Sequence, residues 1–307
     1  MTLTGDMPAP IAMREYPPLT FLWLEITGRC QLECTHCYAG SSPSGTHGTM
    51  TAEDWRNVLD QAAELGVTSV QFIGGEPTLH PALHELVHHA LARDLRVEVF
   101  TNLVHVTDDL WHVFSCPGVS LATSYYSDDP GEHATITGRP SHARTRANIA
   151  KALDRGIPLR AGLIDLADDQ RVDQAEAELV DLGVPEIGRD RVRHVGRGGH
   201  GQPGTVDQLC GQCGHGSAAV AADGTVWPCV FSRWLPIGNV RETGLAAALT
   251  SEEATRVGEE LRAAFAERLA TMCVPNVCDP QCGPSCSPAC RPAGNCRPVG
   301  ACAPDYG

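Results

Sequence analysis

Strand and helix patterns alternate along the first two thirds of the sequence. Six short apolar runs bounded by turn residues follow one another between residues 20 and 195. They lie at residues 21–27, 67–73, 95–100, 119–124, 157–164 and 187–194. Such alternation requires a parallel sheet with right-handed crossovers, either open or curled into all or part of a barrel. The sequence therefore predicts an α/β fold in which functional residues gather at the carboxyl ends of the strands.

Helical periodicity follows five of the runs and is clearest over residues 51–66. Thr51 and Asp54 suit the amino terminus of a helix, and Gly66 suits its carboxyl terminus. One face of this helix is apolar and carries Trp55, Val58, Leu59 and Ala62. The other helices are predicted over residues 81–93, 108–115, 141–155 and 168–182.

The composition changes near residue 196. The stretch GRGGHGQPG, residues 196–204, predicts either a linker or a flexible active-site loop, and ten of the fourteen cysteines follow it. A helix is expected over residues 251–271, but the tail after it has few large apolar side chains and cannot bury a core of its own. Crosslinks, metal or docking must hold that tail. The predicted division is 1–19, 20–195, 196–209 and 210–307.

Charge and composition exclude several classes of protein. With 23 basic and 37 acidic residues the formal charge is -14, which argues against a nucleic acid or an anionic membrane as partner. No apolar run approaches the roughly 20 residues that span a bilayer, and the start lacks a signal-peptide pattern. We therefore expect a cytoplasmic protein, in which fourteen cysteines indicate metal or redox ligands more than disulfides.

Three cysteines stand in a short loop directly after the first predicted strand. Cys30, Cys34 and Cys37 have spacings of four and three, and the next cysteine in the chain is Cys116. Three thiolates can hold three corners of an iron-sulfur cubane and leave the fourth iron open to another ligand. The alternative is a structural zinc site completed by a nearby histidine, His36 or His47.

Further motifs at strand ends give the loop a family context. Tyr38 follows the third cysteine, Gly74-Gly75-Glu76-Pro77 follows the second strand, Thr101-Asn102 follows the third, and Ser124 ends the fourth. With these motifs, residues 20–195 resemble the radical S-adenosylmethionine (SAM) enzymes. The resemblance implies a partial (β/α)6 barrel of the TIM type, followed by a small cysteine-rich iron-sulfur domain.

The resemblance also implies roles for individual residues. The three cysteines bind a [4Fe-4S] cluster whose open iron is chelated by the amino and carboxylate groups of SAM. Gly74, Gly75 and Glu76 hold the methionyl amine in this interpretation. The other cofactor positions implied are Tyr38 beside the cluster, Thr101 and Ser124 at the ribose or carboxylate, and Ile164 against adenine. Thr and Ser at strand ends also often serve as simple caps, so that reading stays open for both.

The sequence departs from the family at His133-x3-Thr137-Gly138, where many relatives have arginine in place of Thr137. If a guanidinium must meet the SAM carboxylate, Arg144 on the following helix is the candidate, with a solvated side chain as the alternative. The loop from Arg193 to Arg197 leaves the sixth strand at the same edge. It can contact the substrate or cofactor, or it can be a solvated basic loop.

Residues 210–240 resemble the start of the SPASM extension of peptide-modifying radical SAM enzymes. The matches are Cys213, the Gly224-x4-Cys229 spacing and the stretch from Ile237 to Val240. The later cysteines depart from the family spacing, except for Cys282-x3-Cys286. The candidate ligands are Cys210, Cys213, Cys229, Cys273, Cys278, Cys282, Cys286, Cys290, Cys296 and Cys302. They predict one or two auxiliary iron-sulfur clusters, with four-thiolate zinc as the alternative.

The function implied by the resemblance is hydrogen abstraction by a 5'-deoxyadenosyl radical made from SAM. The SPASM-like tail favours a ribosomally made precursor peptide as substrate. A separate peptide-recognition protein and a flavodoxin- or ferredoxin-type electron donor are the expected partners. The alternatives are modification of a small-molecule biosynthetic intermediate and, in another class, a non-catalytic electron-transfer or metal-binding protein. The residues do not identify the substrate, the bond formed or the catalytic acid or base.

Overall fold

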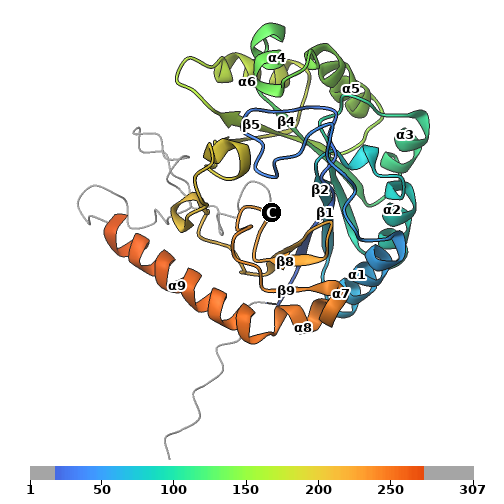
Figure 1. Ribbon diagram of the computed structural model, residues 1–307. Helices are drawn as coiled ribbons and strands as arrows, with labels where there is room; N and C mark the ends of the chain where they lie inside the picture. The colour runs from blue at the N-terminus through green and yellow to red at the C-terminus, as the bar shows by residue number, and fades with distance from the viewer. Residues whose placement is uncertain (1–17, 273–307) are drawn as a thin grey trace, which may run out of the picture.

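The computed structural model describes residues 18–272, with side chains through residue 266. Six parallel strands lie side by side in chain order and confirm the predicted α/β fold (Figure 1). They are β1 (Phe21–Thr27), β2 (Ser69–Gly74), β3 (Arg96–Phe100), β4 (Val119–Tyr125), β5 (Leu159–Asp165) and β6 (Glu186–Arg191). The last strand ends at Arg191, before the predicted residue 194, because the chain then turns toward the cysteine loop.

The crossover helices lie around the outside of the curved sheet (Figure 1). The predicted ones are α1 (Ala52–Glu64), α2 (Leu83–Ala92), α3 (Asp108–Phe114), α5 (His142–Asp154) and α6 (Val172–Asp181). In α1 the predicted cap is present: Thr51 Oγ1 accepts from the Asp54 N–H at 3.1 Å, and the Asp54 carboxylate accepts from the Thr51 N–H at 2.8 Å. The apolar face of α1 is buried as predicted.

Two local differences from the sequence prediction have clear causes. A further helix, α4 (Pro130–Thr137), carries almost no apolar stripe, so periodicity could not reveal it. It begins at the Asp129 cap and ends at Gly138 with φ of 73°. Helix α6 begins four residues later than predicted because the Gln170 side-chain amide donates to the carbonyls of Tyr126 and Ile164, at 2.8 and 2.9 Å, and forms a turn.

The sheet continues beyond β1 with three short strands that the sequence patterns did not predict. These are β7 (Ser217–Val220), parallel to β1, and the antiparallel β8 (Thr225–Trp227) and β9 (Gly238–Asn239). The order of the nine-stranded sheet is β6-β5-β4-β3-β2-β1-β7-β8-β9. The predicted domain division at residues 196–209 stays a prediction. The strands before and after this segment belong to one hydrogen-bonded sheet, because β7 pairs with β1.

Short helices complete the described part of the chain. The 3-10 helices are η1 (Pro77–Leu79), η2 (Gly196–Gly199) and η3 (Val206–Gln208). Helices α7 (Val240–Thr243) and α8 (Leu245–Leu249) precede α9 (Glu252–Met272), which matches the helix predicted over 251–271. No helix within residues 18–272 is long and apolar enough to cross a membrane.

The two faces of the central strands differ in character. In β1, Leu22, Leu24 and Ile26 are fully buried in the hydrophobic core. Residues of the opposite parity, such as Trp23 in β1 and Gln71 in β2, line a cavity instead. The sheet therefore encloses a space on its concave side, and the loops at the carboxyl ends of the strands open onto it.

Candidate active site

The cavity on the concave side of the sheet has a volume of about 260 Å³ and collects most of the predicted site residues that lie within the described part of the chain. Those that line it are Cys30, Cys34, Cys37, Tyr38, Gly74, Gly75, Ser124, Ile164, Cys210 and Cys229. Glu76, Thr101, Arg144 and Cys213 do not line it. Segments from both ends of the described chain thus meet in one space.

The cysteine loop between β1 and α1 provides three free thiols. Burial raises the pKa of Cys30 to about 12, and the charge of Glu76 adds to this. Burial and the neighbouring Cys37 likewise raise the pKa of Cys34 to about 12. Such thiols ionise only when a cation compensates the charge, as iron does in a cluster.

The donor set fits a cluster better than a single ion. Within residues 18–272, no three His, Cys, Asp or Glu side chains converge as one metal ion requires. The three thiols nevertheless line one cavity, and the charges of the neighbouring thiols contribute to the raised pKa values of Cys30 and Cys34. Thiolates that each bind a different iron of a cubane need not converge on a point. These residues therefore suit a [4Fe-4S] cluster.

The glycines after β2 allow two backbone segments to pass very close. A Cβ on Gly74, whose φ is 124°, would lie 2.4 Å from the Thr27 carbonyl oxygen. A Cβ on Gly75 would lie 2.3 Å from the carbonyl oxygen of Arg29, next to the first cysteine. The backbone next to these glycines is also hydrogen-bonded to the cysteine loop, since the Glu76 N–H donates to Arg29 O at 2.8 Å. The motif thus fixes where the cysteine loop begins.

Glu76 lies behind the cavity wall and is fully buried. One carboxylate oxygen accepts from the Thr78 N–H at 3.1 Å, the Thr78 hydroxyl at 2.8 Å and the Thr101 hydroxyl at 2.7 Å. The other accepts from the Asn102 N–H at 2.8 Å. The Asn102 side-chain amide in turn donates to Cys30 Sγ at 3.6 Å. Glu76 and Thr101 thus connect the ends of β2 and β3 to the cysteine loop, and their direct contact with SAM stays a prediction.

Thr137, at the end of α4, stands where relatives carry arginine. It is fully buried, and its hydroxyl lies 2.8 Å from the His133 carbonyl oxygen and 2.9 Å from that of Arg139. Arg144 is exposed on α5 and lies outside the cavity wall. The arginines in the wall, which the sequence analysis did not assign to SAM, are Arg189, Arg191, Arg193 and Arg197. Their signal in the sequence was the basic stretch at the end of β6.

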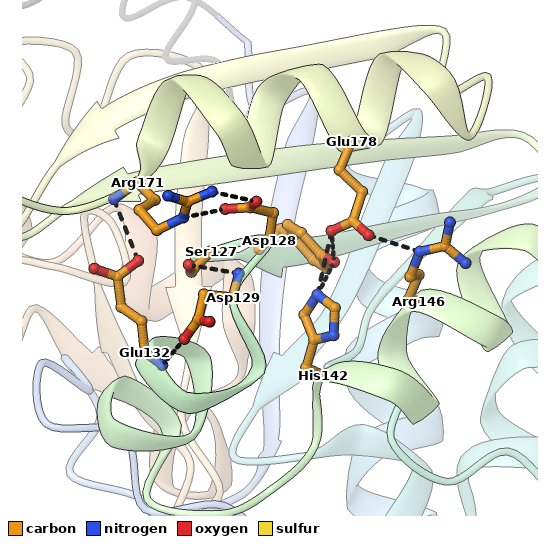
Figure 2. A network of polar contacts seen from close by, with 9 residues as sticks. Ser127, Asp128, Asp129, Glu132, His142, Arg146, Arg171 and Glu178 are labelled. Carbon is orange, nitrogen blue, oxygen red and sulfur yellow. Dashed lines mark hydrogen bonds and ion pairs between the residues drawn. The ribbon is translucent and has the colours of Figure 1, made fainter.

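Helix α4 supports the cysteine loop through its backbone. The Glu33 N–H donates to Thr137 O at 3.0 Å, and the Thr35 N–H donates to Ile136 O at 2.9 Å. Asp129 caps α4 by accepting from the Glu132 N–H at 2.7 Å, and the Glu132 carboxylate links α4 to the start of α6 by accepting from the Arg171 N–H at 3.2 Å (Figure 2). The loop shape therefore depends on residues about a hundred positions away.

A second polar group links α5 to α6 (Figure 2). The Tyr125 hydroxyl lies 2.5 Å from Glu178 Oε2 and 2.7 Å from His142 Nε2, and Arg146 donates to Glu178 Oε1 at 2.6 Å. His133, which the sequence analysis did not assign, lies between this group and the cavity and is 2% exposed. Burial lowers the pKa of His133 to about 4, so its imidazole is neutral near pH 7.

The second group of cysteines contributes Cys210 and Cys229 to the wall of the same cavity. Cys213 and Cys229 are buried, with their sulfur atoms 3.0 Å apart. The Cys213 thiol donates to Cys210 and lowers the pKa of Cys210 to about 6, and the Arg193 guanidinium acts in the same direction. Clustered thiols with one already acidic suit metal binding. The predicted ligands Cys273, Cys278, Cys282, Cys286, Cys290, Cys296 and Cys302 lie outside the described residues.

An aromatic contact lies between the two groups. The Tyr38 ring, next to Cys37, packs edge-on against Phe231 with centroids 5.1 Å apart, and Phe231 follows Cys229 by two residues. Burial raises the pKa of Tyr38. Cys116, in contrast, lies after α3 and does not line the cavity.

Comparison with known families assigns both parts of the chain. Residues 24–176 match the radical SAM superfamily, and residues 210–287 match SPASM, an iron-sulfur cluster-binding domain. The PqqA peptide cyclase of Xanthomonas campestris pv. campestris is 33% identical over 185 residues, covering 59% of this chain and 49% of the relative. That of Streptomyces rochei is 31% identical over 170 residues, covering 55% and 46%. The chain thus spans about half the length of the curated relatives it matches.

Solved structures share the fold at low sequence identity. Streptococcus suis SuiB bound to its precursor peptide SuiA has a TM-score of 0.62 at 13% identity, covering 86% of this chain and 75% of that one. anSMEcpe with bound AdoMet has a TM-score of 0.63 at 13% identity, covering 82% and 86%. Both family models match this chain, and its barrel-like sheet and cysteine positions are consistent with them. The chain therefore belongs to the radical SAM superfamily and carries a SPASM iron-sulfur cluster-binding domain.

Proposed function

We propose that the protein is a radical SAM enzyme that modifies a ribosomally made peptide, by crosslinking, epimerisation or another side-chain change. One observation carries the proposal: the cysteine loop after β1 and two cysteines of the SPASM region, Cys210 and Cys229, line the same cavity. The 33% identity to PqqA peptide cyclases supports a peptide substrate over a small molecule. The superfamily match agrees with the predicted cofactors, a [4Fe-4S] cluster and SAM.

Different residues of the cavity wall have different roles in the proposed reaction. When bound, the cluster and SAM supply a 5'-deoxyadenosyl radical that abstracts hydrogen from carbon. Cys30, Cys34 and Cys37 hold the cluster, and the backbone of Gly74 and Gly75 lies beside it for the methionyl amine. Apolar wall residues such as Ile164 exclude water from the reacting atoms.

Cys210, Cys213 and Cys229 belong to one or two auxiliary iron-sulfur clusters in this proposal. These residues would hold such a cluster, which would supply an electron acceptor for a substrate radical or an anchor for the substrate. The competing assignment is zinc, which four thiolates hold equally well. Iron and sulfide counts on anaerobically purified protein separate the two: about four irons lost in a Cys30/Cys34/Cys37→Ala variant, with more remaining, indicate auxiliary clusters.

Two partners complete the proposal. A flavodoxin- or ferredoxin-type protein supplies the electron that reduces the cluster. A separate recognition protein, or direct binding of the leader segment, brings the precursor peptide to the cavity. The similarity to PqqA peptide cyclases and to the SuiB complex with SuiA supports a peptide as the substrate.

The first test is SAM cleavage. The full chain, reconstituted anaerobically and reduced with dithionite, is expected to produce 5'-deoxyadenosine from SAM. The triple change of Cys30, Cys34 and Cys37 to alanine abolishes it, whereas Cys116→Ala, a thiol outside the cavity, retains it. A triple variant that still makes 5'-deoxyadenosine contradicts the enzyme assignment and favours a different site.

The second test concerns the substrate. A deuterated candidate precursor peptide is expected to transfer deuterium into 5'-deoxyadenosine and to emerge with a changed mass. SAM cleavage without any peptide-dependent turnover rejects the peptide and leaves the small-molecule alternative. Absence of SAM cleavage altogether leaves only the non-catalytic electron-transfer or metal-binding alternative.

A further inference from the structure

The segment Val195–Gly199, which follows β6 and includes η2, packs against the cysteine loop. The backbone N–H of Arg197 donates to the Cys37 carbonyl oxygen at 2.9 Å. Its guanidinium donates from Nε to Cys34 O at 2.8 Å and from Nη2 to Ser41 O at 2.7 Å. One residue, 163 positions from Cys34, thus binds three carbonyls of the loop, two of them on cluster cysteines.

The glycines on both sides of Arg197 make this approach possible. Gly196 has φ of 59°, and a Cβ there would lie 2.1 Å from the Tyr38 carbonyl oxygen. A Cβ on Gly198 would lie 2.7 Å from Arg193 O and 3.2 Å from His36 O. Any side chain at Gly196 would push the segment away from the loop. The stretch Gly-Arg-Gly, which the sequence analysis left as a linker or loop, therefore fits a contact with the cysteine loop.

The charge of Arg197 is placed differently from that of its neighbour Arg193. Arg193 forms an ion pair with Asp190 at 2.7 Å, so its charge is balanced locally. Within residues 18–266, the bonds of the Arg197 guanidinium go to carbonyl oxygens, and no carboxylate forms an ion pair with it. It lies in the cavity wall, next to Cys34. The cation is thus left to act on whatever negative charge the loop carries.

We propose that Arg197 is a positioning residue for the cluster: it holds the cysteine loop in its binding shape and places an unbalanced positive charge beside Cys34. The proposal rests on the proposed iron-sulfur site. A nearby cation stabilises the more negative, reduced state of a cluster and so raises its reduction potential. Arg197 therefore favours the reduction with which the proposed reaction begins.

The clamping role is tested in the metal-free full chain by hydrogen–deuterium exchange. In Arg197→Gln, amides of residues 34–41 are expected to exchange at least about tenfold faster, because two charge-assisted bonds to the loop are lost. Arg96→Gln, an exposed arginine at the amino end of β3, is the matched control and leaves the loop unchanged. Gly196→Ala keeps the charge but obstructs the approach, so it is expected to speed exchange as well.

Exchange of the β3 and β4 amides shows whether each variant is folded. If Arg197→Gln does not fold, Arg197→Lys is measured in its place. Lysine retains charge but cannot bind two carbonyls in a fixed fork, so partial protection is expected. Parent-like exchange of residues 34–41 in Arg197→Gln and Gly196→Ala rejects the clamp. This measurement needs neither cluster nor SAM, so it can fail or succeed independently of the proposed function.

The charge is tested by the midpoint potential of the reconstituted protein, following the EPR signal that changes when SAM is added. Arg197→Gln is expected to have a lower potential than the parent protein, and Arg197→Lys to restore most of the difference. A potential that is unchanged in Arg197→Gln rejects the electrostatic role. A potential equally low in both variants rejects it too, since only the lysine variant keeps the cation.

Discussion

The two cysteine groups that contribute to the cavity wall are built in different ways. The loop with Cys30, Cys34 and Cys37 is held by backbone and side-chain bonds from segments far away in the sequence, after β2, at the end of α4 and after β6. In the group with Cys210, Cys213 and Cys229, the thiols hydrogen-bond to one another.

This difference has a chemical consequence. Burial without a nearby donor thiol raises the pKa of Cys30, whereas a donated thiol hydrogen bond lowers that of Cys210. The first group is shaped by the fold, and its Cys30 and Cys34 are protonated without metal, so cluster binding by these two thiols releases protons. The second group already holds an ionised thiol, and the cysteines predicted to complete it lie beyond the described residues. The surrounding fold therefore shapes the first cysteine group, whereas hydrogen bonds among the thiols shape the described part of the second group.

The largest expected effect comes from removing the scaffold of the first group at Glu76. Glu76→Ala leaves the buried donors of Thr78, Thr101 and Asn102 without their acceptor, so it is expected to destabilise the protein by about 3 kcal/mol or more. Urea unfolding measures the change. Glu186→Ala, an exposed carboxylate at the start of β6, is the control and is expected to stay within about 0.5 kcal/mol. Equal stabilities of the two variants would show that Glu76 does not organise the strand ends.

The contrast in thiol ionisation predicts selective alkylation. In metal-free protein at pH 7, iodoacetamide is expected to modify Cys210 on the order of a hundredfold faster than Cys30, because only Cys210 is largely ionised. The Cys210 rate falls as the pH drops through about 6, where the thiol becomes protonated. Peptide mass spectrometry over a pH series measures both sites.

Cys213→Ala is the informative variant for this contrast. It removes the thiol that donates to Cys210, so the midpoint of the Cys210 rate profile is expected to move up in pH while Cys30 stays unreactive. Comparable rates at Cys30 and Cys210 in the parent protein would contradict the distinction between the two groups.

The sequence alone predicted the parts of this architecture that local patterns encode. Strand β1 and the cap of α1 match closely, because alternation and capping chemistry act over a few residues. The strands β7 to β9 were not predicted, since strands of two to four residues carry too little pattern and form by pairing with β1. Helix α4 was missed for a different reason, since it has almost no apolar stripe and its position depends on contacts with the cysteine loop.

The candidate site shows the same limit. The cysteine loop and the two glycines were found by spacing and resemblance, and they do meet in one cavity. Arg144 was selected by its nearness in sequence to Thr137, yet it is exposed, and Arg197 reaches the loop instead. A contact between residues 163 positions apart in the sequence produces no local sequence pattern. The two glycines on either side of Arg197 are its one sign in the sequence.

The smallest expected effect tests the support from α4, where this chain lacks the family's arginine. Thr137→Val removes a buried hydroxyl bonded to carbonyls at the helix end, so a loss of about 1 kcal/mol in unfolding free energy is expected. Thr135→Val, on the exposed side of the same helix, is the matched control. Because the Glu33 N–H binds the backbone carbonyl of Thr137, exchange of that amide is expected to quicken while amides near Cys213 do not change. Faster exchange at both cysteine groups would mean that they share one scaffold, and the distinction between them would then be wrong.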